Sequence, residues 1–258
     1  MTFMQKPAVL ITGSATRIGA EIAKGFAQAG WHVVIHHLTS PDEADALAKT
    51  FSSAETVSCD LDDENAAVAM IEDLAARLPG FRCLVNSASI FHYDNAARLD
   101  AQTNREAMQV NALTPALMTR AFLDRAQGGA SQNEKPCVIQ VTDMKIENAN
   151  PDFFSYTMSK HALASTIEMF AIEESSKARI YGIAPGAILA SHDQTEEETE
   201  TSHRLNLLER KTGTDEIADA ALFLSSGALK SGSTLFVDSG QHLVSQPRDV
   251  IYLARENA

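Results

Sequence analysis

Tyr156 and Lys160, in the stretch SYTMSK, are the residues whose types and spacing most directly suggest chemistry. They are four positions apart, so on a helix their side chains lie on one face. A phenol has an ordinary pKa of about 10, and a nearby ammonium group stabilises the phenolate and lowers that pKa. Such a pair can exchange a proton with a carbonyl or imine while hydride is added to the neighbouring carbon. Because this spacing is also common by chance, the pair alone does not establish an enzyme.

A second candidate is the stretch TGSATRIG, residues 12–19, which follows the apolar run AVLI and precedes a helical pattern. A strand-to-helix turn presents unpaired N–H groups and the positive end of the helix dipole, which together favour a phosphate. The stretch contains Gly13 and Gly19, but it has neither the GKS or GKT of a P-loop nor the GxGxxG of common dinucleotide-binding loops. It also carries Arg17 where the backbone must pass close to its ligand. The loop becomes a specific signal only in combination with the Tyr–Lys pair.

The elements that must position these residues alternate along the chain. We expect strands at residues 8–12, 32–36, 56–60, 82–86, 137–141, 179–184 and 234–238. Helical patterns cover residues 18–29, 42–51, 63–77, 102–125, 154–174 and 215–225. Several strands are apolar almost throughout, which is typical of parallel strands covered on both faces. We therefore predict an α/β fold: one Rossmann-type doubly wound domain over residues 1–258, with a seven-stranded, mainly parallel sheet and helices on both faces.

The composition limits the partners. The formal net charge of −13 argues against nucleic-acid and membrane-surface binding, because phosphate backbones and anionic lipids require a face rich in Lys and Arg. The stretch MTFMQKPAVLITG lacks a secretory pattern, and no apolar run approaches the roughly 20 residues that span a bilayer, so we expect a cytoplasmic protein. The three cysteines have no CxxC spacing and no other residues have metal-ligand spacing, so no metal is expected.

Two segments near the C-terminus allow alternative interpretations. Residues 188–204, ILASHDQTEEETETSHR, are acidic and poor in apolar residues, and they follow the sixth predicted strand at the edge where α/β proteins bind ligands. They can be a solvated, mobile segment, a lid, or both, and we expect a mobile substrate loop over about residues 188–213. The tail HLVSQPRDVIYLARENA mixes apolar and charged residues, so it can pack on the body or on a neighbouring copy.

Over essentially its whole length the sequence resembles the short-chain dehydrogenase/reductase family. The resemblance rests on the glycine loop, on YTMSK, and on CDL, LVNSAS, VNA, APG and VDSGQ at the corresponding places in the chain. It implies that Asn111, Tyr156 and Lys160 form a proton relay through a water molecule, with Lys160 also binding the nicotinamide ribose. It also implies that Asp60 lies near the adenine, with Asn86 and Ala88 beside the ribose and nicotinamide.

The residues after the second predicted strand indicate which cofactor binds. NAD-dependent enzymes usually carry an acidic residue there, which binds the ribose 2′-hydroxyl and repels a 2′-phosphate. VVIHHLTSPDE has no acidic residue before Asp42, while its His, Thr and Ser side chains and the nearby Arg17 are compatible with a phosphate. We predict NADP(H), although the arginine that related reductases often carry at position 39 is missing. The expected cofactor-binding residues are Gly13, Arg17, Ile18, Gly19, His36, His37, Thr39, Ser40, Asp60, Leu61, Asn86, Ala88, Lys160, Pro185, Gly186 and Ile188.

Three departures from the usual family pattern resemble the pteridine reductase branch. Arg17 stands where Gly or Ala is usual, Asp143 replaces a serine thirteen residues before the tyrosine, and NSASIF replaces NNAG. The branch implies that the arginine contacts cofactor phosphate and substrate, that Phe91 stacks on the pterin, and that the serine and aspartate hydrogen-bond it. A flat pterin suits an aromatic platform with directional polar partners. Ordinary packing for Phe91 and turn capping for Asp143 are the alternatives. The expected substrate-binding residues are Arg17, Ser89, Phe91, Asp143 and Tyr156.

The sequence therefore predicts an NADPH-dependent reductase that transfers hydride to a dihydropterin-type substrate. The expected catalytic residues are Asn111, Asp143, Tyr156 and Lys160, with Asp143 and Tyr156 managing the proton. One alternative is an NADPH-dependent reductase of the same fold that acts on a ketone, a sugar or an acyl thioester. Another is a catalytically silent nucleotide-binding regulator, although binding alone does not need the intact relay. The family resemblance also implies a homotetramer.

Overall fold

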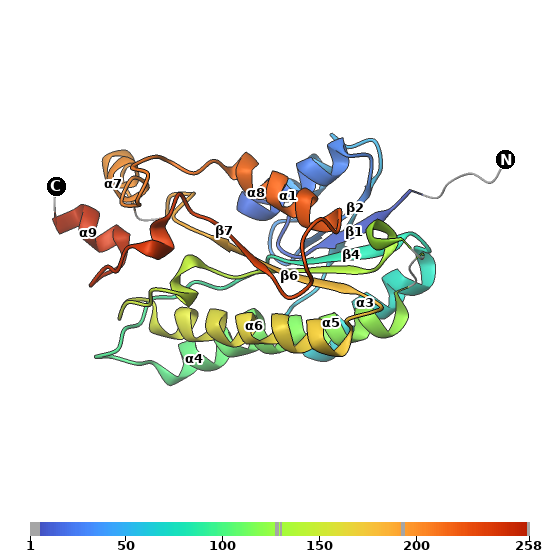
Figure 1. Ribbon diagram of the computed structural model, residues 1–258, viewed down its shortest axis with the longest axis horizontal. Helices are drawn as coiled ribbons and strands as arrows, with labels where there is room; N and C mark the ends of the chain where they lie inside the picture. The colour runs from blue at the N-terminus through green and yellow to red at the C-terminus, as the bar shows by residue number, and fades with distance from the viewer. Residues whose placement is uncertain (1–5, 127–128, 130, 192–193, 257–258) are drawn as a thin grey trace.

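The computed structural model describes residues 6–126, 129, 131–191 and 194–256, and a seven-stranded sheet runs through its centre (Figure 1). Its strands are β1 (Ala8–Ile11), β2 (His32–His37), β3 (Ala54–Ser58), β4 (Phe81–Asn86), β5 (Cys137–Val141), β6 (Arg179–Pro185) and β7 (Thr234–Val237). The order is β3-β2-β1-β4-β5-β6-β7, and the six neighbouring pairs are all parallel. The prediction of a Rossmann-type doubly wound sheet is confirmed, and the pairing is entirely rather than mainly parallel.

Helices form a layer on each face of this sheet. They are α1 (Arg17–Gln28), α2 (Pro41–Ala48), α3 (Glu64–Arg77), α4 (Ala101–Met108), α5 (Thr114–Arg125), α6 (Phe154–Glu173), α7 (Glu196–Ser202), α8 (Thr214–Ser225) and α9 (Val250–Glu256). In Figure 1, α1 and α8 pack together on one face, while α3, α5 and α6 lie on the other. The layered arrangement covers the faces of the sheet and leaves the ends of its strands open to a ligand.

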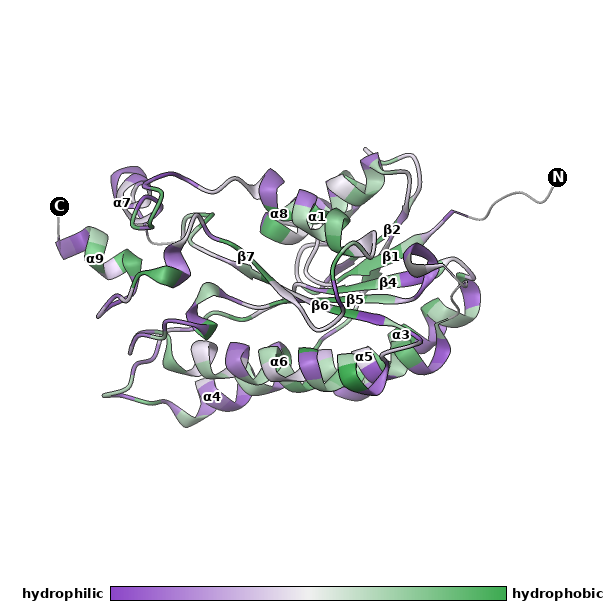
Figure 2. Ribbon diagram, viewed as in Figure 1, coloured by the Kyte–Doolittle hydropathy of each residue, from purple (hydrophilic) through white to green (hydrophobic). Residues whose placement is uncertain are grey.

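The two layers explain why the strands are apolar at consecutive positions. In β1, Val9 and Ile11 belong to the core beneath α1 and α8, whereas Ala8 and Leu10 belong to the core beneath α3 and α5. Successive side chains of a strand point to opposite faces, so a sheet covered on both faces buries all of them. Figure 2 shows the same pattern, with hydrophobic strands at the centre and hydrophilic positions on the outer sides of the helices.

The long helix expected over residues 102–125 is interrupted. A π-helical turn, Gln109–Leu113, separates α4 from α5. Pro115 in the first turn of α5 has no N–H to donate to the preceding turn, and a wider turn accommodates this loss. Asn111 lies inside the π-helical turn, so the irregularity is next to a residue that the family resemblance places in the relay.

The acidic segment expected to be a loop contains α7. The Thr195 hydroxyl accepts from the backbone N–H of Glu198 at 3.1 Å, and a Glu198 carboxylate oxygen accepts from the backbone N–H of Thr195 at 3.0 Å. This capping box fixes the start of the helix. α7 packs against α9, where Glu198 pairs with Arg255 at 3.1 Å, so the C-terminal tail packs on the body of its own chain. Residues 192–193 lie outside the described residues, and mobility of the segment stays a prediction.

The described part of the chain has no helix that combines the length and apolar character needed to cross a bilayer. Nor do three His, Cys, Asp or Glu side chains within that part gather closely enough to hold a metal ion. Residues 1–5, which belong to the N-terminal stretch used above, are not among the described residues.

Candidate active site

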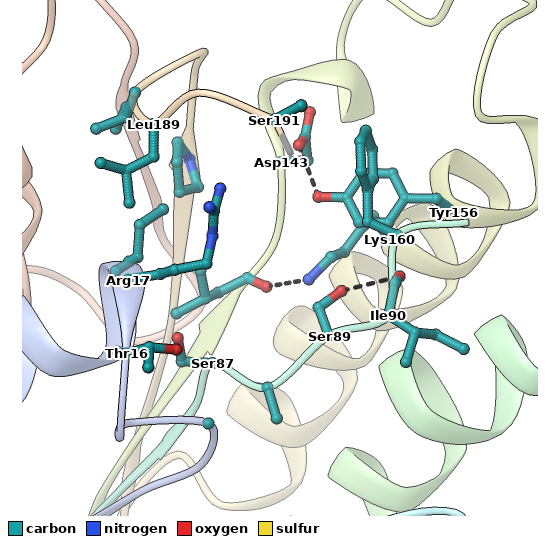
Figure 3. A pocket seen from close by; sticks show the side chains of 18 of the residues that line it. Thr16, Arg17, Ser87, Ser89, Ile90, Asp143, Tyr156, Lys160, Leu189 and Ser191 are labelled. Atoms are coloured by element: carbon teal, nitrogen blue, oxygen red, sulfur yellow. Dashed lines mark hydrogen bonds between the residues drawn. The ribbon is translucent and has the colours of Figure 1, made fainter. Parts of the chain in front are cut away.

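A cavity of about 580 Å³ lies at the carboxyl ends of the central strands. Its volume is in the range of small-molecule sites, and its position is where doubly wound sheets bind ligands. Every predicted site residue lines this cavity except Asn86 and Asn111. Figure 3 shows Asp143, Tyr156 and Lys160 gathered on one side, with Arg17 extending toward them from the start of α1. The tertiary structure thus brings together residues that the sequence separates by more than a hundred positions.

The glycine loop between β1 and α1 is packed so closely that only glycine fits at two of its positions. Gly13 has φ +64°, and a Cβ there would lie 2.9 Å from the Cα of Ala88. A Cβ on Gly19 would lie 2.4 Å from the carbonyl oxygen of Gly13. The Thr12 hydroxyl oxygen accepts from the backbone N–H groups of Ser87 and Ala88 at 2.9 and 3.0 Å, which ties this loop to the end of β4. Such a cradle of backbone at a helix N-terminus fits the phosphates of a dinucleotide.

Arg17 occupies the one position of this loop where its backbone is strained. Its φ is +55°, a left-handed conformation that glycine adopts freely and that costs other residues about 1 kcal/mol or more. Both terminal nitrogens of its guanidinium donate to the carbonyl oxygen of Ala190 at 3.2 Å. The side chain therefore extends from the loop after β1 to the segment after β6, along the cavity. The exposed guanidinium and the strained backbone of Arg17 indicate contact with an anionic group in the cavity rather than a role in packing.

His36 uses its ring to support the glycine loop, and its predicted contact with the cofactor phosphate stays a prediction. Its Nδ1 accepts from the backbone N–H of Gly13 at 3.0 Å, and its Nε2 donates to the carbonyl oxygen of Cys59 at 3.0 Å. Both ring nitrogens are therefore used inside the protein, in the neutral form. Burial lowers the pKa of His36 to about 4. His36 lines the cavity, and its ring supports the glycine loop from within the protein; His37, Thr39 and Ser40, which lead into α2, also line the cavity.

Asp143, Tyr156 and Lys160 form the most polar part of the cavity. The Tyr156 hydroxyl donates to Oδ2 of Asp143 at 2.8 Å, while Oδ1 of Asp143 accepts from the backbone N–H of Lys145 at 2.9 Å. Lys160 Nζ donates to the carbonyl oxygen of Val141 at 2.8 Å and lies 5.5 Å from the centroid of the Tyr156 ring. Asp143 thus both caps the turn after β5 and contacts the tyrosine, and its role toward a substrate stays a prediction.

Burial dominates the acid–base properties of these three groups. Burial raises the pKa of Asp143, and the positive charges of Lys145 and Lys160 oppose that rise. Burial and the neighbouring Asp143 raise the pKa of Tyr156 well above its ordinary value. Burial lowers the pKa of Lys160 to about 8. The net effect on Tyr156 is therefore a raised pKa, because burial and the Asp143 carboxylate both disfavour the phenolate.

The two predicted residues that do not line the cavity act behind it. The Asn111 side chain accepts from the backbone N–H of Ile90 at 2.8 Å and donates to its carbonyl oxygen at 3.0 Å, so it holds the loop that carries Phe91. The Asn86 side chain turns into the protein, where its Nδ2 donates to Gln140 Oε1 at 3.0 Å. This places the Asn86 side chain away from the ribose position that the resemblance implies. A relay through Asn111 stays a prediction.

Phe91 is partly packed and partly open. Its ring stacks on Phe153 with centroids 4.0 Å apart and meets the edge of the Tyr156 ring at 4.6 Å. It nevertheless remains 41% exposed. Tyr252 of α9 also packs near Phe153, with ring centroids 6.3 Å apart. Phe91 therefore belongs to an aromatic cluster and keeps part of its ring open, which supports that ring as a platform in the cavity.

The sequence reasoning missed the residues that the turn after β5 and the C-terminal segment contribute. Lys145, Gln241, Asp249, Val250 and Ile251 also line the cavity. The Gln241 side-chain oxygen accepts from the backbone N–H of Ala187 at 2.9 Å. Lys145 could have been found from its place two residues after Asp143. Gln241 is the last residue of the VDSGQ motif. No pattern signals Asp249, Val250 or Ile251, because only the folding of that segment onto the body brings them to the cavity.

Comparison with known proteins agrees with this geometry. A family model described as enoyl-(acyl carrier protein) reductase matches residues 13–242. The dihydromonapterin reductase of Citrobacter koseri is 26% identical over 237 residues, which cover 91% of this chain and 96% of that protein.

Two solved structures are similar over nearly their whole length. FolM alternative dihydrofolate reductase 1 from Brucella canis, complexed with NADP, has a TM-score of 0.84 and 29% identity, covering 94% of this chain and 96% of that one. The angucycline C-6 ketoreductase LanV with bound NADP has a TM-score of 0.82 and 25% identity, covering 92% of this chain and 96% of that one. Given the parallel sheet, the glycine loop and the Tyr156–Lys160 face, these matches show that the chain belongs to the short-chain dehydrogenase/reductase family of oxidoreductases.

Proposed function

We propose that the protein is an NADPH-dependent reductase that transfers hydride to a ring carbon of a dihydropterin-type substrate. The observation that carries the proposal is the 2.8 Å hydrogen bond from the Tyr156 hydroxyl to the Asp143 carboxylate, in the same cavity as the open ring of Phe91. NADPH supplies the hydride when it is bound. Asp143 and Tyr156 share a proton that a substrate ring nitrogen can accept, and Phe91 provides the platform for a flat heterocycle.

The remaining predicted residues have roles that fit this reaction. Lys160, fixed by the carbonyl of Val141, would hold the nicotinamide ribose and contribute positive charge near Asp143. Arg17 would contact both the cofactor phosphates and the substrate. Thr39 and Ser40 would bind the 2′-phosphate, although Asp42 and Glu43 in the first turn of α2 oppose an anion there. Hydroxyl groups that can bind the 2′-phosphate, beside carboxylates that repel it, support a moderate preference for NADPH over NADH. The NADP in the similar structures supports the same cofactor.

The relatives favour a pterin substrate and keep a ketone as the second candidate. The similar proteins include one named dihydromonapterin reductase and one named alternative dihydrofolate reductase, but also a ketoreductase. Asp143 favours the pterin. A carboxyl group that shares a proton with Tyr156 can deliver that proton to a ring nitrogen, whereas the serine that is usual at this position donates a hydrogen bond to a ketone oxygen. The intact Asp143, Tyr156 and Lys160 cluster argues against a silent nucleotide-binding regulator.

The assembly and organisation are part of the proposal. Apolar side chains at Leu113, Leu117, Met169 and Ile172 are exposed on the helical layer of α5 and α6, and a second copy of the chain can cover them in a homotetramer. Light scattering coupled to size exclusion tests this, and a monomer would contradict it.

We further propose one catalytic domain, with residues 188–213 as the substrate loop. The cytoplasmic location stays a prediction.

One assay tests the proposed function. The purified protein is incubated with NADPH, or with NADH, and with one candidate substrate at a time: a dihydropterin, a ketone or an acyl thioester. The loss of cofactor absorbance is followed. We expect turnover of dihydropterins with a lower KM for NADPH than for NADH. Turnover of ketones with none of the dihydropterins would overturn the substrate, and binding of NADPH without turnover of any compound would favour the regulator.

A further inference from the structure

A buried ion pair lies in the cavity beside the proton-sharing residues, and none of the predicted site residues forms it. Lys145 Nζ is 2.5 Å from Oδ2 of Asp249, and the two side chains are only 7% and 8% exposed. Lys145 belongs to the turn after β5, and Asp249 immediately precedes α9. Both residues line the cavity. The pair therefore joins the C-terminal segment to the turn that carries Asp143.

Asp249 is held in place independently of Lys145. Its Oδ1 accepts from the backbone N–H of Ile251 at 3.0 Å, which caps the start of α9. Its own backbone N–H donates to Oδ2 of Asp152 at 2.9 Å, and the same oxygen accepts from Nε of Arg248 at 2.7 Å. The Asp249 carboxylate is thus presented to the cavity as a fixed negative charge.

Lys145 is the link between this charge and the reacting groups. Its backbone N–H donates to Oδ1 of Asp143 at 2.9 Å, on the opposite side of the carboxylate from Tyr156. Its ammonium also contacts the carbonyl oxygen of Asp152 at 3.3 Å and lies 5.1 Å from the centroid of the Phe153 ring. The other charged and titratable groups around Asp143, Tyr156 and Lys145 are Lys160 and His161 from α6, Asp152 before α6 with its partner Arg248, and Asp249 from the C-terminal segment.

We propose that Asp249 is a positioning residue for the reaction, acting through Lys145 to keep the Asp143 carboxylate paired with the Tyr156 hydroxyl. Without Asp249, two carboxylates remain that interact with the Lys145 ammonium, Asp143 and Asp152. Arg248 already pairs with Asp152 at 2.7 Å, so the ammonium would pair with Asp143 and compete with the tyrosine for it. A buried ion pair is weak evidence for stability, since two charges must lose their hydration. Stability therefore does not explain why the Lys145–Asp249 pair lies in the cavity beside Asp143 and Tyr156. An effect of the pair on their shared proton does explain it. The inference rests on the proposed function.

The charges predict opposite effects of two substitutions. Asp249→Asn keeps a residue that can cap α9 but removes the charge. The freed Lys145 ammonium then stabilises the ionised form of Asp143, so the shared proton is lost at lower pH. The alkaline limb of the kcat–pH profile therefore moves to lower pH by about one unit. Lys145→Met removes the positive charge that opposes the raised pKa of Asp143, so the same limb moves up. We expect kcat of Asp249→Asn to fall about tenfold and Asp249→Glu to recover most of it.

The experiment compares these three variants with Glu174→Gln, which breaks a partly buried ion pair with Arg120 at the far end of α6. That control should lower the melting temperature and leave the pH profile unchanged. NADPH affinity, measured by fluorescence, should stay near wild type in all four. If Asp249→Asn and Lys145→Met move the limb in the same direction, or if only their melting temperatures change, Asp249 is structural and the inference is overturned. A wild-type protein that reduces none of the panel compounds overturns the proposed function instead.

Discussion

The cavity has two halves that are built from different kinds of contact. In the glycine-loop half, lined by Gly13 and by residues 15–19, 36–40 and 87–88, the decisive contacts involve the backbone, such as the Gly13 N–H to His36. In the tyrosine half, formed by Asp143, Lys145, Tyr156, Lys160 and residues 249–251, they join side chains from distant parts of the chain. The first half has a shape that a dinucleotide fits, and the second has the groups that hold a proton. Substitutions in the two halves should therefore affect different measured quantities.

The largest effect is expected from Tyr156→Phe, which removes the hydroxyl that contacts Asp143 and leaves the ring in place. We expect kcat for a dihydropterin to fall about a thousandfold, because a positioned proton donor contributes on that scale. NADPH affinity, measured by fluorescence titration, should change by less than about twofold. A comparable loss of NADPH binding would show that the two halves are not separable.

The pH dependence of stability tests the support behind the glycine loop. His36 has a pKa of about 4 in the folded protein against 6.5 for the free side chain, so the folded state binds fewer protons between these values. The free energy of unfolding should therefore fall as the pH drops from 6.5 to 4, by about 3 kcal/mol from this residue. Urea unfolding from pH 4 to 7 measures it, and His36→Gln should lack this component. A His36→Gln protein with the wild-type slope would contradict the assignment.

Gly13→Ala tests whether backbone shape alone binds the cofactor. The added Cβ meets the Ala88 backbone and the residue must keep a positive φ, so we expect the Kd for NADPH to rise at least about tenfold, or about 1.4 kcal/mol. Gly30→Ala is the matched control, because Gly30 also has a positive φ, +83°, but a Cβ there would meet nothing within 4 Å. The control should lose stability and keep its NADPH affinity. Equal NADPH affinity in both variants would refute the role of close packing.

The smallest effect is expected from Phe91→Ala. Loss of the open aromatic face should raise KM for a dihydropterin about three- to tenfold, while kcat and NADPH affinity stay near wild type. Steady-state kinetics with NADPH in excess measure it. The companion variant Phe91→Trp keeps a flat face and should retain a low KM. If Phe91→Ala leaves KM unchanged, Phe91 is packing for Phe153 and the tyrosine half binds its substrate by other means.

The sequence determined most of the fold and the glycine-loop half. Consecutive apolar residues in β1 predicted burial on both faces, and the two layers of helices confirm it. The motifs near Gly13, Tyr156 and Lys160 are local patterns whose spacing follows from a turn or from one helix face. These motifs can be recognised in the sequence because the chemistry and the local structure require the same residues at the same spacing.

The tertiary structure alone decided what surrounds these residues. It used both ring nitrogens of His36 in hydrogen bonds within the protein, turned the Asn86 side chain inward, and raised the pKa of Tyr156 by burial. It also brought Asp249 to Lys145 across about a hundred positions of sequence. Burial and contacts between distant segments depend on how the whole chain packs, and no short pattern encodes them. The motifs therefore predict which groups can react, while packing sets their charge states and their partners.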